Sequence, residues 1–426
     1  MTTAVDTRDY FTDLSLLKDP YNYLATIRAQ GPVYHYPKRD LYYVTGFEEA
    51  IEVLRNSEDF ASVATAAGIA PLPFEPEGDD ISEQIEKYRP EILGSDMVAA
   101  YDGPRHAALR SLISRIFTPS RLKENEEYID RLADEIAAEM VAKGSCEVIN
   151  EVATPYVTLV IADLLGVPDE DMNAFRDAID AGPPPFDMTA VDSDAQAEPS
   201  SFFITCGTFF YNYVTDRRTN PRDDIMTELA NASFPDGSVP DDIELVKTMM
   251  FLFGAGQDTT AKLLGNAIRY LAEDTELQQL LREDRTKVNG FIEEMLRMEG
   301  SVKATFRLAK RNASIGGVEI PAGKRVIIFL SGANRDPVRW ESPDEFQLQR
   351  ERHTRHVAFG QGLHTCIGAP LARTEVRVIL NKILDKTANF TLSETHHGGG
   401  DDRRIDYETS YVIRGLSNLH INITPA

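Results

Sequence analysis

Helical periodicity dominates the middle of this sequence and limits the folds open to it. Apolar residues recur at three- and four-residue spacing in PRHAALRSLISRIF, RLKENEEYIDRLADEIAAEMVA and VATPYVTLVIADLLG, which follow one another between residues 104 and 166. The longest helical candidate runs from Asp241 to Glu273. Strand-like segments are few and lie near residues 32–46 and 302–330. The pattern predicts a mainly α protein with a small β portion.

The remaining segments complete this outline. We expect an opening helix from Asp19 to Gln30, a helix from Ile367 to Leu384 and a hairpin near the C-terminus. The run AGPPPFDMTAVDSDAQAEPSS, from residue 181, holds three consecutive prolines. A helix does not continue through such a run, so it predicts a connection between two helices. No solenoid-length repeat or low-complexity linker divides the chain, and we expect one domain over residues 1–426.

Charge and cysteine content narrow the class of protein. There are 44 Lys and Arg against 68 Asp and Glu, a formal net charge of −24. Such a surface repels nucleic-acid phosphates and anionic lipid, so we expect neither as a partner. Three scattered cysteines make no disulfide framework. No signal peptide is recognisable, and no apolar run approaches the roughly 20 residues of a membrane span. These features predict a soluble cytoplasmic protein, and we expect a monomer.

The last cysteine, Cys366, lies in a glycine-rich segment, HVAFGQGLHTCIGAPLA. Glycines permit close backbone approach, and the positive end of the following helix is expected to lower the pKa of the thiol. These residues alone leave four interpretations open. Cys366 is a buried packing residue, a nucleophile paired with His364, a zinc ligand, or an axial thiolate for heme iron. Zinc is disfavoured, because no Cys/His pairs stand at the usual spacing.

The same segment resembles the heme-ligand loop of the cytochrome P450 family, Phe-Gly-x-Gly-x-His-x-Cys-x-Gly. All six fixed positions are present, namely Phe359, Gly360, Gly362, His364, Cys366 and Gly368. The resemblance implies the cytochrome P450 fold, a helical domain with a small β-rich N-terminal region. It also implies heme b (iron protoporphyrin IX) as the cofactor, with Cys366 as the iron ligand.

The long helix contains a second motif, FLFGAGQDTTAKLL. Gly254 and Gly256 each cost roughly 1 kcal/mol in a helix interior, and close packing against another helix is the plain explanation. The segment from Ala255 also resembles the family's oxygen-binding signature, where the helix bulges beside the heme. The resemblance gives Asp258 and Thr259 catalytic roles, as a proton relay and as a hydrogen-bonding partner of bound oxygen.

Further matches concern the heme propionates and the scaffold. His106 and Arg110 stand four apart in DGPRHAALR, where the family more often has proline in place of Gly103. Taken alone, His106 is also readable as a core histidine, and Arg307 as a surface charge. The cofactor-binding set implied by the resemblance is His106, Arg110, Ala255, Arg307, Phe359, Gly360, His364 and Cys366. A spacing of three residues between Glu294 and Arg297 is a weak signal by itself. It resembles the family's structural salt bridge, completed by Arg350.

The resemblance implies a monooxygenase that inserts one atom of dioxygen into a lipophilic small molecule (terpenoid, steroid or hydrophobic aromatic). No reductase domain follows the thiolate helix, so we expect electrons from an iron–sulfur ferredoxin and its NAD(P)H-dependent reductase. The residues expected to form a basic docking patch are Arg110, Arg115, Arg373 and Arg377. Two alternatives share the heme, a peroxygenase and a non-enzymatic heme sensor, and the Asp258–Thr259 pair argues against both. A cysteine hydrolase would be colourless.

The substrate pocket is expected to be mostly apolar. Its predicted walls are Phe251, Leu252, Val302, Lys303 and Tyr411, with the loop before Asp102 and the proline-rich connection after Gly182. Apolar walls favour a lipophilic substrate. Lys303 is the exception, and it leaves an acidic or carbonyl-bearing substrate possible.

Overall fold

The computed structural model describes residues 6–173, 177, 201–351 and 353–426. The structure is about 54% helical with small sheets, which confirms the mainly α class. The proline-rich connection predicted after Gly182 lies outside the described residues. None of the described helices is long and apolar enough to cross a membrane.

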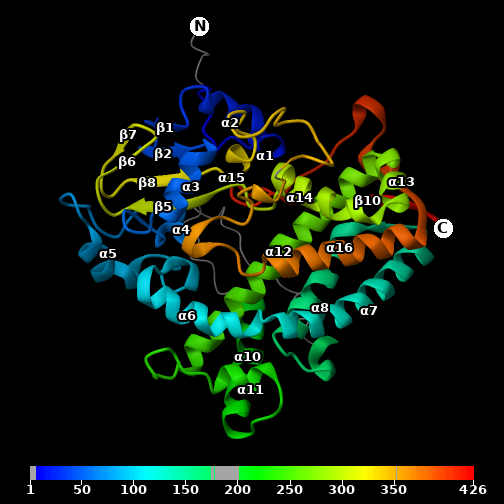
Figure 1. Cartoon of the computed structure of the whole chain (residues 1–426), viewed down its shortest axis with the longest axis horizontal. Coiled ribbons are helices and arrows are strands. Elements are labelled where there is room, and N and C mark those ends of the chain that lie inside the picture. The colour runs from blue at the N-terminus through cyan, green and yellow to red at the C-terminus, as the bar shows by residue number, and fades with distance from the viewer. Residues whose placement is uncertain (1–5, 174–176, 178–200, 352) are drawn as a thin grey trace.

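A group of long helices forms the larger part of the molecule (Figure 1). They are α6 (Gly103–Ile116), α7 (Pro119–Lys143), α8 (Thr154–Leu164), α10 (Ser201–Thr219), α12 (Asp242–Glu273), α13 (Thr275–Glu283), α14 (Val288–Glu299) and α16 (Ala369–Lys386). The shorter helices are α1 (Ser15–Lys18), α2 (Tyr21–Arg28), α3 (Phe47–Arg55), α4 (Ala64–Ala67), α5 (Ser82–Tyr88), α11 (Ile225–Ala230), α15 (Leu330–Ala333) and α17 (Glu394–His397). The opening helix, the long helix and the helix after the cysteine loop are therefore all found close to their predicted bounds.

Helix α12 passes through the centre of this group and packs against α8, α10, α14 and α16 (Figure 1). It begins where the side chain of Asp241 accepts a hydrogen bond from the backbone N–H of Glu244, an N-cap. Most of its residues are buried, on several sides, as expected for a helix surrounded by neighbours. This position lets α12 form one wall of a central site.

A five-stranded sheet forms the other part, in the order β1-β2-β8-β5-β3. Its strands are β1 (Val33–Tyr36), β2 (Leu41–Val44), β8 (Arg325–Ile328), β5 (Thr305–Ala309) and β3 (Phe60–Ala61). All four residues of β2 are buried, as expected for an inner strand of a sheet that is covered on both faces. Its neighbours in the sheet are β1, which is antiparallel to it, and β8, which is parallel. The predicted β-rich N-terminal region is thus completed by two strands from residues 305–328.

The smaller sheets lie elsewhere in the chain. β6 (Ala313–Ile315) and β7 (Val318–Ile320) form a hairpin, and β4 (Ser145–Glu147), β10 (His420–Pro425) and β9 (Thr387–Leu392) form a three-stranded sheet in that order. The predicted C-terminal hairpin therefore differs from a tight one. β9 and β10 are antiparallel partners, but the long segment 393–419 separates them. We call this segment the C-terminal loop.

Candidate active site

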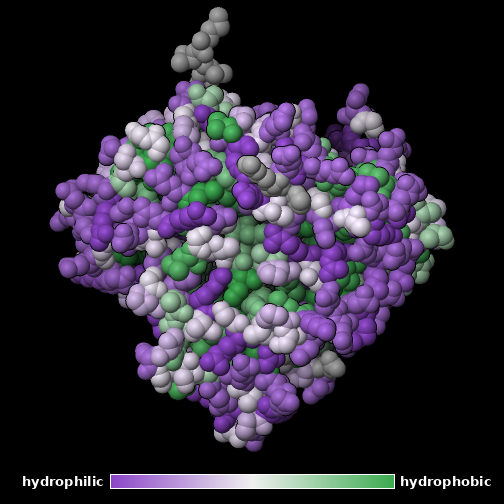
Figure 2. All heavy atoms as spheres, viewed as in Figure 1, coloured by the Kyte–Doolittle hydropathy of each residue, from purple (hydrophilic) through white to green (hydrophobic). Residues whose placement is uncertain are grey.

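A cavity of about 320 Å³ lies between α12 and the cysteine loop. Side chains from α6, α8, α12, α16 and the segment from Ser301 to Arg307 line it. Apolar atoms are visible in a hollow near the middle of the face drawn in Figure 2, surrounded by hydrophilic surface. The structure places these predicted site residues on its wall: His106, Arg110, Phe251, Leu252, Ala255, Thr259, Val302, Arg307, Phe359, Gly360, His364 and Cys366.

The cysteine loop is shaped by backbone contacts that its glycines permit. The Cys366 N–H donates to the carbonyl of Phe359 over 2.9 Å and closes the loop. Gly362 has φ of +74°, and a Cβ there would lie 2.8 Å from the Leu54 carbonyl oxygen. A side chain at Gly362 would therefore be strained by both conformation and space.

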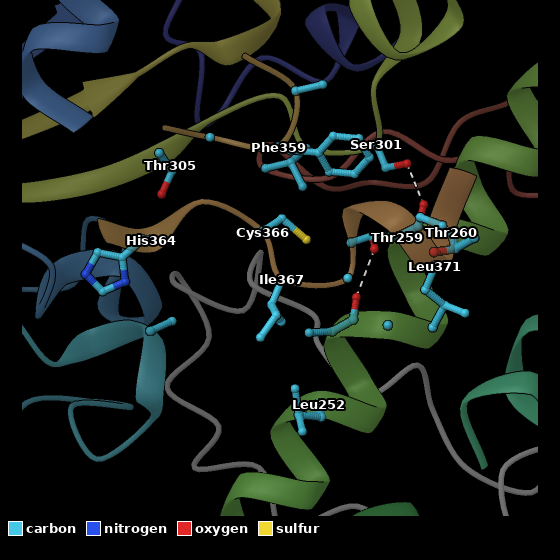
Figure 3. A pocket seen from close by; sticks show the side chains of 18 of the residues that line it. Leu252, Thr259, Thr260, Ser301, Thr305, Phe359, His364, Cys366, Ile367 and Leu371 are labelled. Atoms are coloured by element: carbon cyan, nitrogen blue, oxygen red, sulfur yellow. Dashed lines mark hydrogen bonds between the residues drawn. The ribbon is translucent and has the colours of Figure 1, made fainter. Parts of the chain in front are cut away.

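The Cys366 thiol points into the cavity, toward α12 (Figure 3). Burial raises the pKa of the thiol, although the backbone N–H groups of Gly368 and Ala369 and the guanidinium of Arg110 act to lower it. The helix-end N–H groups therefore act in the predicted direction, but burial outweighs them and the net shift is upward. A metal ion is what would make Cys366 a thiolate here.

Arg307 is a buried cation on the cavity wall. It is 4% exposed, and its guanidinium donates to Thr65 Oγ1 over 3.2 Å and to the Phe306 carbonyl over 2.8 Å. It takes part in none of the ion pairs formed among the described residues, and burial lowers its pKa to about 10. A buried guanidinium without a carboxylate is costly, so the position fits an anionic group that enters the cavity.

Two histidines lie at the same end of the cavity. The rings of His106 and His364 are 4.3 Å apart between centroids, and His106 Nδ1 is buried without a hydrogen-bond partner. Burial, with His364 and Arg110 nearby, lowers the pKa of His106 to about 4, so this ring is neutral. His364 Nε2 lies 3.1 Å from Asp102 Oδ1 and 2.9 Å from Ser62 Oγ. This end of the cavity therefore holds two arginines, Arg110 and Arg307, and an imidazole nitrogen of His106 that has no hydrogen-bond partner. It is the end at which the propionates of a heme are expected.

On α12, Thr259 faces the cavity. Its hydroxyl donates to the Ala255 carbonyl over 2.8 Å, and its own carbonyl accepts a 2.5 Å hydrogen bond from Ser301 Oγ (Figure 3). The helix runs unbroken from Asp242 to Glu273, so the predicted bulge is not present as an interruption. Gly256 has a packing reason, since a Cβ there would lie 3.2 Å from Ile161 Cδ1 of α8.

Asp258, predicted to act as a proton relay, does not itself line the cavity. Its carboxylate is held by the ammonium of Lys262, one turn further along α12, and Lys262 also lies 2.9 Å from Glu408. The sequence pattern placed Asp258 beside Thr259, but neighbouring helical residues point in different directions.

Lys303 and Tyr411 are corrections to the predicted pocket, because neither lines the cavity. Val302 pairs with Ile413 in an antiparallel bridge, and successive side chains alternate, so Lys303 points away from Val302. Lys303 is 1% exposed and its ammonium donates to the Ser410 carbonyl over 2.7 Å. Tyr411 packs against the ring of Tyr10. The possible anchor for an acidic substrate is thereby removed.

The predicted scaffold ion pair is present and lies outside the cavity. Arg297 Nη2 lies 2.8 Å and Arg350 Nε 2.9 Å from Glu294 Oε1, all three side chains being buried. Burial raises the pKa of Glu294, but these two guanidinium groups outweigh it and the net shift is downward.

The four arginines predicted to form a basic docking patch all have polar partners in the structure. Arg115, Arg373 and Arg377 each lie beside a carboxylate, from Glu228, Glu293 and Glu126 respectively. Arg110 instead donates to the Thr365 carbonyl and supports the cysteine loop. Sequence spacing does not reveal these partners, because they come from distant segments of the chain. The docking role of the arginines stays a prediction.

Sequence reasoning missed one buried acid on the wall. Glu375, on α16, is 1% exposed and lines the cavity, and burial raises its pKa well above the usual range despite a hydrogen bond from Thr260. Its signal was present in the sequence, as a carboxylate within the apolar face of the helix after Cys366.

Comparison with known proteins identifies the family of this chain. The family model "Cytochrome P450" matches residues 194–406. Cytochrome P450 109 of Bacillus spizizenii is 30% identical over 409 residues, which cover 95% of this chain and 92% of that protein. This chain belongs to the cytochrome P450 family. It is a cytochrome P450 monooxygenase, and its cofactor is heme b.

Solved P450 structures share the whole architecture. Substrate-free CYP150A6 from Mycobacterium marinum is 43% identical, with a TM-score of 0.92 and coverage of 99% of this P450 and 100% of that chain. CYP109E1 from Bacillus megaterium, in complex with corticosterone, is 27% identical, with a TM-score of 0.77 and coverage of 95% and 99%. The cytochrome P450 fold is therefore confirmed.

Proposed function

We propose that this P450 hydroxylates a neutral lipophilic small molecule, of the terpenoid, steroid or hydrophobic aromatic class, with dioxygen. The observation that best supports this proposal is the distribution of charged groups around the cavity. Its cationic and imidazole groups, His106, Arg110, Arg307 and His364, are those matched to the propionates, while Phe251, Leu252, Ala255 and Val302 form an apolar wall. Without a cation left for a substrate carboxylate among the described lining residues, burial of apolar surface drives binding.

The residues have distinct roles in this proposal. When bound, the heme supplies activation of dioxygen at its iron. Cys366 would hold the iron and His106, Arg110, Arg307 and His364 would bind the propionates. Phe359, Gly360 and Ala255 would complete the cofactor-binding set. Thr259 donates hydrogen bonds at the cavity wall, and Asp258 moves protons to it from the solvent side. Glu294, Arg297 and Arg350 hold the scaffold.

Electrons are supplied, in this proposal, by an iron–sulfur ferredoxin and its NAD(P)H-dependent reductase, and the enzyme acts as a monomer. CYP109E1, which is 27% identical to this chain, has been solved with corticosterone bound. That complex supports a lipophilic substrate for this P450 as well. The adjacent acid and alcohol, Asp258 and Thr259, favour dioxygen over a peroxygenase or a heme sensor, since proton delivery to bound oxygen needs such groups.

An optical titration of the ferric enzyme tests the substrate class. Monoterpenoids, small arenes and steroids are added in separate series, with fatty acids as the charged comparison. A shift of the Soret band toward high spin with neutral compounds, and turnover with ferredoxin, reductase and NADPH, is the expected result. Tighter binding of fatty acids than of every neutral compound would contradict the proposal.

A further inference from the structure

Lys262 lies between two carboxylates from segments far apart in the sequence. It is on α12, one turn after Asp258, and its ammonium also lies 2.9 Å from Glu408 of the C-terminal loop. Its side chain is only 9% exposed. Burial lowers the pKa of Lys262, but both carboxylates raise it and the net shift is upward, so the ammonium stays charged. A buried charge of this kind requires its partners.

The protein makes room for this lysine. A Cβ on Gly415 would lie 2.5 to 2.7 Å from three carbons of the Lys262 side chain, so the C-terminal loop passes closely over its stem. The loop is fixed there, because the N–H of Glu408 donates to the Gly415 carbonyl over 3.0 Å and Asn266 of α12 donates to the Arg414 carbonyl over 3.4 Å. Glu408 is thus presented to Lys262 by an anchored backbone.

The same contacts reach the cavity wall. The N–H of Arg414 donates to the Ser301 carbonyl over 2.7 Å, and Ser301 in turn binds the Thr259 carbonyl. Asp258 lies next to Thr259 in the chain and is paired with Lys262, and 17% of its side chain is exposed. It is open to exchange of protons with solvent, but Lys262 holds its carboxylate away from the cavity.

We propose that Lys262 and Glu408 are positioning residues for Asp258: Glu408 neutralises Lys262 whenever Asp258 leaves it to serve the cavity. This rests on the relay role given to Asp258 under the proposed function. In each cycle Asp258 takes a proton from water and turns toward Thr259. It gives that proton to the Thr259 hydroxyl as the hydroxyl releases its own into the cavity, and Asp258 returns to Lys262 as a carboxylate. One proton enters and one leaves.

The test is a double-mutant cycle of Glu408→Gln and Lys262→Met in the heme-loaded enzyme. The substrate is the compound giving the largest spectral shift in the titration above, with ferredoxin, reductase and NADPH. Glu408→Gln should lower product formation roughly three- to tenfold, because Asp258 must then remain with Lys262; this lies within the range of coupling for residues in contact. The ratio of rates in H₂O and D₂O should rise, with unchanged substrate affinity. In the Lys262→Met background, Glu408→Gln should have no further effect.

Matched controls use the same chemistry on α12. Lys247→Met and Glu244→Gln alter ion pairs with Asp96 and Arg105, about four and five turns before Lys262, and should leave the isotope ratio unchanged. The thermal midpoint of unfolding is also measured for the parent, the two single variants and the double variant. A coupling between Lys262 and Glu408 in these midpoints reports their contact independently of activity. Since Glu408 is 33% exposed, its single variant tests the proposal even if Lys262→Met does not fold.

The outcomes separate this inference from the proposed relay. Three results would each overturn the inference. The first is a Glu408→Gln variant with the parental rate and isotope ratio. The second is a loss of rate from Glu408→Gln that is equally large with and without Lys262→Met, and the third is no coupling between the two residues in the thermal midpoint. Asp258→Asn is measured beside them and should lose roughly 100-fold in turnover. If Asp258→Asn turns over at the parental rate, the relay role itself is wrong. If only Asp258→Asn is slow, the relay stands and the positioning role falls.

Discussion

Ser301 Oγ donates a 2.5 Å hydrogen bond to the carbonyl of Thr259, joining the segment after α14 to the middle of α12. The Thr259 hydroxyl meanwhile donates back to Ala255. Thr259 is therefore held at two atoms, its hydroxyl and its carbonyl, on a helix whose other faces are packed. Ser301, 42 positions away in the sequence, thus holds the backbone of Thr259 at the cavity wall.

Replacing Ser301 with alanine removes this contact. We expect a loss of about 1 kcal/mol in the free energy of unfolding, since the partner carbonyl keeps its helical position but loses a donor. We also expect more reducing equivalents to appear as hydrogen peroxide, because Thr259 is less firmly oriented. Denaturant unfolding and the product-to-peroxide ratio measure the two effects. An unchanged ratio would show that the contact supports stability alone.

Gly362→Ala should disrupt the cysteine loop. The new Cβ meets the Leu54 carbonyl at 2.8 Å in a backbone with φ of +74°, so we expect a cost of about 1–3 kcal/mol and weaker heme retention. Gly400→Ala is the control, because its φ is +55° but nothing lies within 4 Å of its Cβ. Equal losses of stability in the two variants would mean that conformation, and not the contact with Leu54, sets the requirement for glycine.

Arg307→Met should affect the heme-free and heme-loaded protein in opposite directions. Removing a buried, unpaired guanidinium leaves the heme-free protein as stable or more stable. Loss of a charged hydrogen bond to a propionate should speed heme transfer to apomyoglobin by roughly 10- to 100-fold. Arg325→Met is the matched control, since burial also lowers the pKa of Arg325 to about 10 but Arg325 does not line the cavity. Equally fast transfer from both variants would contradict the propionate role.

Lys303 predicts a specific dependence of stability on pH. Burial, together with Arg414, lowers its pKa to about 7 from an ordinary value of 10.5. Between pH 7 and 10 the unfolded chain therefore binds a proton that the folded protein lacks, and the stability of the parent rises with pH. Relative to Lys303→Met, the gain should be about 1.4 kcal/mol per pH unit. Denaturant unfolding of both proteins at pH 7, 8 and 9 measures it, and parallel curves would show that Lys303 stays charged.

Much of this protein was predictable from local patterns. The glycines around Cys366 predicted an irregular loop, and the positive φ of Gly362 is a local demand of this kind. The bounds of α12 and α16 followed from periodicity, which reports the burial of a helix face. The spacing of Glu294 and Arg297 likewise anticipated a contact within one helix.

Other features depended on contacts between segments that the sequence separates widely. Asp258 faces Lys262 and not the cavity, Lys303 points to Ser410, and Arg377 meets Glu126. Each of these contacts depends on which face of a helix or strand packs against which other segment. The local spacing of residues carries no information about that other segment. The sequence by itself determined the fold class, the main helices and the irregular loop around Cys366, because periodicity and backbone conformation are local. Only the tertiary structure decided which ionic groups face the cavity, because a buried charge turns toward whatever partner the packed chain brings within reach.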